Sequence, residues 1–245
     1  MMLNRRVFQA AAVAVIAGLA ACGNGAAGDD ARTEFEREGD FATGSPDAPV
    51  VMVEYASTAC PACANFNINV KPTINEYIEN GTLRLVFREM ITPPRDLAIA
   101  GFMLARCAPE DRYFDVLDLV FEQQQAIYQS MQDGRGLQQF QTIAGSAGID
   151  QQRFRECMSD EAMMAEVTAA SERSSRDGVD ATPTFIFNGE LVAAERAPDG
   201  SGLVWAADGA PIEDEDGFIP AQFSGDSFER IILHYQARAE GGSED

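Results

Sequence analysis

The stretch EYASTACPACANF, residues 54–66, places Cys60 and Cys63 three positions apart, where an apolar run gives way to a helix-like pattern. A disulfide framework, a metal site and a redox centre can each use two cysteines at this spacing. The preceding residues, 50–55, are nearly all apolar, as expected of a central strand that is buried on both faces. A helix is expected over residues 61–80, with a kink at its internal proline, so the cysteines lie at a strand-to-helix junction.

The first residues of the chain have the features of an export signal. Arg5 and Arg6 precede an apolar run, residues 10–21, which ends in small residues before Cys22. A helix of this run would reach only about 18 Å, against a hydrocarbon core of about 30 Å, which argues against a transmembrane anchor. The LAAC sequence at its end resembles a bacterial lipobox, which implies removal of residues 1–21 and acylation of Cys22.

Export would expose the other cysteines to an oxidising compartment, where thiols tend to pair. Because Cys60 and Cys63 are so close in sequence, their own pairing is the simplest, which leaves Cys107 with Cys157. Two buried free thiols are the alternative for that second pair. A zinc site needs about four ligands, and the single histidine, His234, is far away on another expected helix, so we expect no metal site.

Composition excludes some partners. The chain has 245 residues, 46% of them hydrophobic, which is enough for one sizeable core. Its net charge is -21, and removal of the signal with its two arginines would make it more negative. Nucleic acid and anionic membrane surfaces are therefore poor partners, and a lipid anchor rather than charge would hold the protein at a membrane.

The chain is expected to divide into a signal, a tether and one elaborated domain. Residues 22–40 are small, polar and charged, as in a flexible tether, and the folded domain is expected over residues 41–245. An acidic excursion at about residues 194–222 is rich in turn residues and contains the only tryptophan, Trp205. We expect an extra hairpin around Trp205; a solvated loop and a partner-docking arm are the alternatives.

Strand and helix patterns alternate along the expected domain. Residues 83–87 alternate as in a second strand, and spacings of three and four predict a block of helices inserted at about residues 94–178. Strand signals return at residues 184–187, before an Asn-Gly turn. A last amphipathic helix is expected around residues 228–235.

Together these motifs resemble the DsbA-like thioredoxin-fold proteins. The resemblance rests on CPAC at a strand-to-helix junction, on ATPTFIFNG at residues 181–189 and on the helical block between them. It covers about residues 41–194 and resumes at the final helix. It implies an α/β fold of the thioredoxin type, with a central mixed sheet, flanking helices and an inserted helical subdomain, and a cis bond before Pro183.

The chemistry of disulfide exchange assigns expected roles to the CPAC residues. Cys60 at the helix start meets free backbone N–H groups and the positive end of the helix dipole, which favour its thiolate. Cys63, one turn later, is expected to be more buried and to act as the resolving thiol. Pro61 needs no N–H at the helix start. The strongest oxidants of the family have histidine where this chain has Ala62, so its helix start must act without that side chain.

Three further residues are expected at the site. In related folds the residue before the cis proline offers its backbone to an extended peptide, which implies substrate binding at Thr182 and Pro183. The alternative is that Pro183 merely starts a strand. Glu54 occupies the position of a buried acid in the resembling family, where burial would raise its pKa and let it exchange protons with Cys63. The alternative for Glu54 is a register that turns it to solvent.

The expected function is an exported thiol-disulfide oxidoreductase, attached to the extracytoplasmic face of a membrane through Cys22 and acting most simply as an oxidase. Its expected partners are exported proteins with cysteines and a membrane redox partner that resets the cysteine pair, and it needs no further cofactor. We expect a monomer. A thiol reductase or isomerase with the same active site is one alternative, and a copper-binding module using Cys60 and Cys63 is another.

Overall fold

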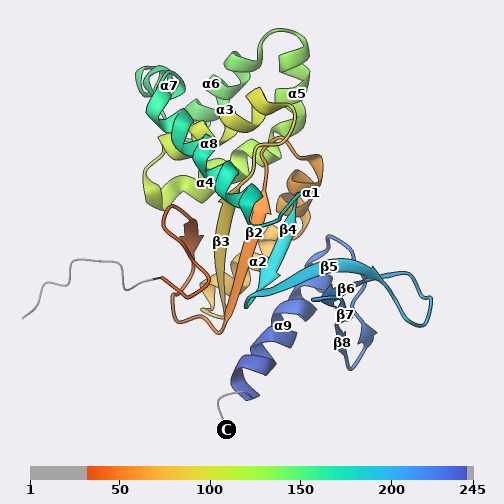
Figure 1. Cartoon of the computed structure of the whole chain (residues 1–245). Coiled ribbons are helices and arrows are strands. Elements are labelled where there is room, and N and C mark those ends of the chain that lie inside the picture. Colours follow the sequence, from red (N-terminus) through yellow and green to blue (C-terminus); the bar gives the residue numbers. More distant parts are fainter. Residues whose placement is uncertain (1–31, 242–245) are drawn as a thin grey trace, which may run out of the picture. The chain divides into compact units, whose positions relative to one another are not determined.

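The structure, a computed structural model, describes residues 32–241 (Figure 1). The expected signal, residues 1–21, and the expected acylation site, Cys22, lie outside the described residues. Within residues 32–241, no helix is both long enough and apolar enough to cross a membrane.

A mixed sheet forms the centre of the described domain. Its strands lie in the order β1-β3-β2-β4-β5-β6-β7, with β2 and β3 parallel and the other neighbours antiparallel. The strands are β1 (Phe41–Thr43), β2 (Val50–Ala56), β3 (Leu83–Glu89), β4 (Thr184–Phe187), β5 (Glu190–Arg196), β6 (Leu203–Ala207) and β7 (Ala210–Pro211). A separate pair is formed by β8 (Glu213–Asp214) and β9 (Gly217–Phe218).

The helices form one block inserted between β3 and β4 and a second set that flanks the sheet. Figure 1 shows the inserted block beyond the end of the sheet at which β2 stops. Its members are α3 (Arg95–Cys107), a 3-10 turn at Glu110–Arg112, α4 (Tyr113–Glu122), α5 (Gln124–Gln132), α6 (Gly136–Ser146), α7 (Gln151–Met158) and α8 (Glu161–Arg176). The others are α1 (Pro61–Asn69), α2 (Lys71–Glu79) and α9 (Gly225–Gly241). The expected fold class, including the helical insertion, is confirmed.

Strand β2 is buried along its whole length, which explains its continuous apolar sequence. Met52 packs on one face with Phe185 of β4 and Ile231 of α9 in a common apolar cluster. Val53 belongs to a second cluster on the other side of the strand. Because β3 and β4 also bond to the two edges of β2, the strand carries the following residues, 57–60, on a rigid support.

The expected single helix after CPAC is two helices. The break falls at Val70, two residues before the proline at which we expected a kink. Pro72 then lies in the first turn of α2, where its missing N–H leaves no intrahelical bond unmade. The same proline therefore starts a helix instead of bending one.

Residues 32–40, which we expected to belong to the flexible tether, pack on the domain instead. Glu36 forms two hydrogen bonds with the Arg84 guanidinium, at 2.7 and 2.9 Å, and its side chain is 4% exposed. Asp40 pairs with Arg88 at 2.9 Å. Polar composition suggested solvation, but these carboxylates neutralise two arginines of β3, so the tether prediction is wrong for this part.

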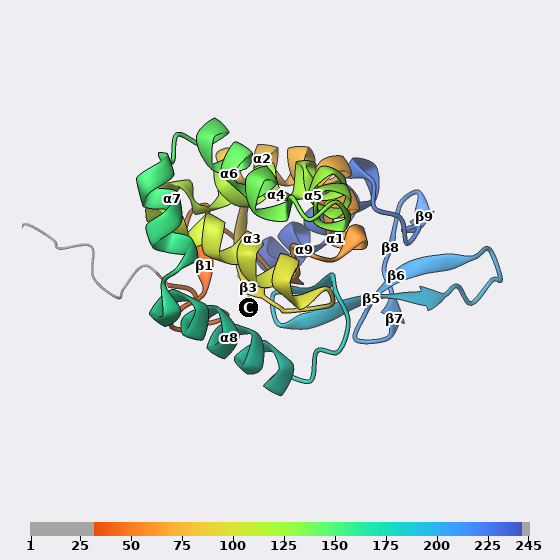
Figure 2. The same ribbon diagram turned by 90° about the horizontal axis from the view of Figure 1, so that it is seen from above.

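The acidic excursion is a folded addition to the sheet. The hairpin expected around Trp205 is present as β5 and β6, and its tip extends away from the body of the domain (Figure 2). Trp205 is 6% exposed and packs against the rings of Phe185, Phe223 and Phe228. The alternative of a solvated loop is therefore wrong, since the excursion contributes to the apolar core.

One disulfide links two helices of the inserted block. Cys107 at the end of α3 is bonded to Cys157 of α7, with a Cα–Cα distance of 5.7 Å. Both residues are buried, so the bond lies in the interior of the block and not on its surface. This is the pairing expected from the sequence, and the alternative of two free thiols does not hold.

Candidate active site

The two remaining cysteines of the described chain lie at the start of α1. Cys60 is the residue that precedes the helix, and its backbone N–H bonds to the carbonyl of Ser57 at 2.9 Å. Pro61 occupies the first helical turn, as expected. Cys60 is partly exposed, Cys63 is fully buried, and both are free thiols. One cysteine is thus accessible to a partner, and the other is protected directly behind it.

The surroundings of Cys60 favour its ionised form. A hydrogen bond from the Cys63 thiol makes the largest contribution, and together with bonds from the Thr182 side chain and the backbone N–H groups of Cys63 and Ala62 it lowers the pKa of Cys60 to about 5. Partial burial opposes this shift without cancelling it. Ala62 therefore acts through its backbone, and Cys60 carries a thiolate at neutral pH.

The surroundings of Cys63 have the opposite effect. Burial raises the pKa of Cys63 far above its ordinary value, and the hydrogen bond to Cys60 and the negative charges of Cys60 and Glu54 raise it further. Cys63 therefore keeps its proton while Cys60 is ionised. This difference is what separates an attacking thiol from a resolving thiol.

Thr182, in the segment before β4, contacts Cys60 although the two residues are 122 positions apart in the sequence. In its protonated form, the Cys60 thiol donates a hydrogen bond to the carbonyl oxygen of Thr182, with a sulfur–oxygen distance of 3.2 Å. The Thr182–Pro183 bond is cis, as is the Pro93–Pro94 bond, which the sequence analysis did not anticipate. Pro183 directly precedes β4, which begins at Thr184.

Glu54 is buried in the middle of β2, between Phe87 of β3 and Phe185 of β4. Its exposed fraction is 4%, so the alternative in which Glu54 faces solvent is wrong. Burial raises the pKa of Glu54 to about 8, against the lowering effect of the positive charge on Lys71. A carboxyl group with this pKa can accept or release a proton near neutral pH.

Sequence reasoning missed an ion pair that acts on Glu54. Lys71 of α2, whose side chain is 7% exposed, bonds to the Asp118 carboxylate of α4 at 3.1 Å. The Asn67 amide also donates to Asp118, at 2.6 Å. The charges of Lys71 and Asp118 shift the pKa of Glu54 in opposite directions. The sequence did contain one indication that Lys71 has a particular role, because it is the only lysine of the chain.

Helix α5 of the inserted block holds the loop that leads into the cysteines. The Gln124 amide donates to the carbonyls of Thr58 and Cys60 at 2.8 and 3.0 Å. The Tyr128 hydroxyl donates to the carbonyl of Ala59 at 2.6 Å. Gln124 is buried on the apolar face of its helix. A polar residue on such a face needs a hydrogen-bond partner, and this was the sequence feature that could have indicated the contact.

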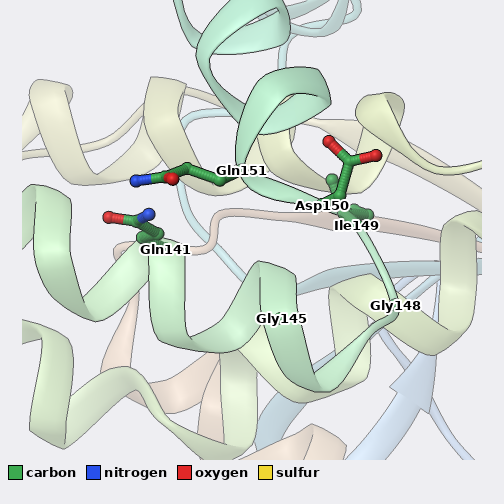
Figure 3. Close-up of a pocket in the computed structure, with 6 residues that line it drawn as sticks. All are labelled: Gln141, Gly145, Gly148, Ile149, Asp150 and Gln151. Carbon is green, nitrogen blue, oxygen red and sulfur yellow. The ribbon is translucent and has the colours of Figure 1, made fainter.

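A pocket with a volume of about 340 Å³ lies away from Cys60, at the junction of α6 and α7 (Figure 3). It is lined by Gln141, Gly145, Gly148, Ile149, Asp150 and Gln151. Asp150 caps α7 by accepting hydrogen bonds from the backbone N–H groups of Gln152 and Arg153. None of the residues around Cys60 lines this pocket, and its one carboxylate is already used by the fold.

A metal site is not formed by the described residues. Within residues 32–241, no three side chains of His, Cys, Asp or Glu are grouped so that they could hold a metal ion. His234 lies on α9 beside Tyr235, and burial lowers its pKa. It takes no part in the Cys60 site.

Comparison with known proteins decides the family. The sequence pattern of the thioredoxin family matches residues 36–202. The chain belongs to the thioredoxin family. Within it, a protein of Rickettsia bellii provisionally named a protein-disulfide oxidoreductase is 28% identical over 62% of this chain and 58% of its own length. Disulfide bond formation protein D of Bacillus subtilis is 23% identical over 63% of this chain and 70% of its own.

The fold agrees with solved structures of the same kind. The crystal structure of alpha-DsbA1 from Wolbachia pipientis superposes with a TM-score of 0.62, at 24% identity, over 85% of this chain and 96% of that one. The resemblance to DsbA-like thioredoxin-fold proteins is therefore confirmed. The chain matches little more than half the length of its Rickettsia relatives.

The low pKa of Cys60 predicts a measurable titration. Ultraviolet absorbance of the thiolate in the reduced protein should show a midpoint near pH 5, because the pKa of Cys60 is lowered from 9.0 to about 5. Ionisation of Cys60 also stabilises the reduced fold, because its pKa is lowered on folding. This contribution is complete above about pH 9 and is lost as the pH falls through about 5. The oxidised protein serves as the control. A thiolate midpoint above pH 8 would contradict the assigned environment.

Glu54→Gln is expected to slow release of a peptide from its mixed disulfide with Cys60 by about a hundredfold. In the unmodified protein, this release should accelerate as the pH rises through about 8, where Glu54 becomes able to accept the proton of Cys63. Quenched-flow measurement across pH shows whether the variant loses that acceleration. Glu79→Gln, at an exposed position of α2, is the control. An unchanged pH profile would remove Glu54 from the mechanism.

Proposed function

We propose that the protein is a thiol-disulfide oxidoreductase that exchanges the Cys60–Cys63 disulfide with cysteines of protein substrates. One observation carries this proposal: a partly exposed Cys60 with a pKa of about 5 lies one helical turn before a fully buried Cys63 with a raised pKa. The two thiols thus differ in access and in ionisation in the way that attack and resolution require.

The reaction follows from this difference when the protein acts as an oxidase. A substrate thiolate attacks the Cys60 sulfur of the disulfide, the bond between Cys60 and Cys63 breaks, and Cys63 leaves with the electron pair. Cys63 then takes a proton, for which the neighbouring Glu54 carboxyl is the proposed donor. A second substrate thiolate attacks the substrate sulfur of the mixed disulfide and expels the Cys60 thiolate. The substrate gains a disulfide, and the protein keeps both electrons as two reduced cysteines.

The favoured direction is net oxidation of the substrate. Hydrogen bonds that stabilise the Cys60 thiolate act only in the reduced protein, because the disulfide carries no charge there. Stabilising the reduced form raises the reduction potential and makes the disulfide a better oxidant. A reductase or isomerase with the same residues is the competing assignment.

Mixing the oxidised protein with a reduced peptide that has two cysteines tests the proposal. One equivalent of protein should convert one equivalent of peptide to its disulfide within seconds to minutes at pH 7 and become fully reduced itself. Insulin reduction in the presence of a dithiol is measured in parallel. Efficient insulin reduction with no stoichiometric peptide oxidation would assign a reductase, and inactivity in both assays would reject the exchange function.

We further propose that the protein is exported and anchored through an acylated Cys22, with residues 1–21 removed. The charged and apolar pattern of the first residues supports this. An exported oxidase would need a membrane partner that reoxidises Cys60 and Cys63 after each turnover. Its substrates would be exported proteins that acquire disulfides.

Cys22→Ser is expected to release the protein from the membrane fraction or to leave its signal uncleaved. The unmodified protein should begin at Cys22, carry acyl chains detectable by mass spectrometry and sediment with membranes. One acyl chain gives only weak attachment, so two or more are expected. A mature chain that starts elsewhere and stays in the soluble fraction would contradict the anchor.

A further inference from the structure

Strand β5 has a partner on both edges for only part of its length. Strand β4 pairs with β5 at Glu190, Leu191 and Val192, whereas β6 pairs with β5 from Val192 to Arg196. Among the described residues, the outer half of β5 therefore has one strand neighbour and one open edge. Figure 2 shows this outer half leaving the body of the domain together with β6.

The direction of the free backbone groups follows from the hydrogen bonds of neighbouring residues. The Leu191 carbonyl accepts from Asp208, and the Ala197 N–H donates to Gly202, so both residues turn their backbone groups toward β6. Successive residues of an antiparallel strand direct these groups to alternate edges. Ala194 and Arg196 therefore direct their N–H and C=O groups to the open edge, and both residues are exposed.

This open edge borders the candidate active site. A cavity of about 530 Å³ is lined by Ala193 and Ala194 of β5 on one side and by Pro183 on the other, with Trp205 also contributing to its lining. The residue before Pro183 is Thr182, whose carbonyl contacts the Cys60 thiol. A chain lying along the edge of β5 would thus pass beside the loop that touches the reacting sulfur.

We propose that the open edge of β5, at Ala194 and Arg196, binds an extended segment of the protein that exchanges its disulfide with Cys60, as an added strand. Alternating free N–H and C=O groups are complementary to an extended backbone and not to a helix or a small ligand. The apolar lining of the cavity receives a side chain of that segment. This inference rests on the proposed function and names the surface that holds its substrate.

Charge favours a foreign segment over a second copy of this chain. The same cavity is lined by Asp177 and Asp180, and the chain carries a net charge of -21. Pairing two copies through this edge would bring like charges together, which is unfavourable. A neutral or basic segment next to a cysteine meets no such repulsion.

Ala194→Pro removes one N–H from the open edge and leaves the bonds to β6 intact, because proline is tolerated where a strand N–H faces outward. The ratio of kcat/KM for a dithiol peptide to the rate with the small dithiol dithiothreitol should fall about three- to tenfold, as for loss of one hydrogen bond. Leu203→Ala, exposed on the other strand of the hairpin, should keep the ratio. An unchanged ratio in Ala194→Pro would overturn the proposal, whereas an unmodified protein inactive on both reagents would instead reject the exchange function.

Amide hydrogen exchange provides a test without a change in β5. In a Cys63→Ser protein carrying the peptide as a mixed disulfide on Cys60, the amides of Ala194 and Arg196 should exchange at least about tenfold more slowly than in the free protein. Ala193 and Glu195, already bonded to β6, are the internal controls and should change little. Unchanged exchange at Ala194 and Arg196 would overturn the proposal. Protection of these amides that accompanies dimer formation, detected by light scattering, would also overturn it.

Discussion

Cys60→Ala is expected to lower kcat/KM for oxidation of a dithiol peptide by at least about a thousandfold, as removal of a nucleophile does in other enzymes. The Cys60 sulfur is the partly exposed one and the one whose pKa is lowered, so no other described sulfur replaces it. Cys63 cannot substitute, since it is fully buried and its pKa is raised.

Two controls separate lost chemistry from lost folding. The reduced Cys60→Ala protein should keep its fold, read by circular dichroism. At pH 7 it should be less stable than the reduced unmodified protein, because it lacks the thiolate that the surroundings of Cys60 stabilise. Cys63→Ala should behave differently from Cys60→Ala, because its intact Cys60 can form a mixed disulfide with an activated peptide but cannot resolve it. Retained peptide oxidation by Cys60→Ala, or failure of Cys63→Ala to trap the peptide, would contradict the assigned roles.

Removing the Cys107–Cys157 disulfide, by changing both residues to alanine, is expected to lower the free energy of unfolding by about 4 kcal/mol. The bond closes a loop of 50 residues, and the chain-entropy model assigns about this value to a loop of that length. For a chain of this size, the loss corresponds to a fall in Tm of about 8 to 16 °C.

The comparison is made in a protein that also carries Cys60→Ala and Cys63→Ala, so that no other described cysteine can react. Urea unfolding followed by circular dichroism gives the difference in free energy. In the protein that retains Cys60 and Cys63, loss of the Cys107–Cys157 disulfide should leave the pKa of Cys60 unchanged, because the groups that lower it are Cys63, Thr182 and the backbone of Ala62 and Cys63. Equal stability with and without the disulfide would contradict its structural role.

Features fixed by local sequence were predicted well. The apolar run of β2 predicted a doubly buried strand because neighbours cover both of its faces. The spacing of Cys60 and Cys63 and the proline between them predicted the helix start, and both features depend on only a few adjacent residues. Glu54 was noticeable because an ionisable residue interrupts that apolar run. Its burial needed the structure, which shows that β3 and β4 enclose it.

Features that depend on distant partners were missed. The polar composition of residues 32–40 gave no sign that Glu36 and Asp40 would meet arginines of β3 about fifty positions away, because charge alone does not identify a partner. The contact of Gln124 with the active-site loop was missed for the same reason. Helical periodicity places Gln124 on a buried face but does not say which loop that face covers.

A glutathione redox titration, read by alkylation and mass spectrometry, directly tests the claim that Cys60 and Cys63 form a reversible redox pair. We expect a single two-electron transition confined to Cys60 and Cys63, with Cys107–Cys157 remaining oxidised throughout. The potential should lie between about -120 mV, as in the strongest oxidants, and about -270 mV, as in thioredoxin. A potential at or below that of thioredoxin would reverse the direction of electron flow, and the absence of any reversible transition at Cys60 and Cys63 would contradict the claim itself.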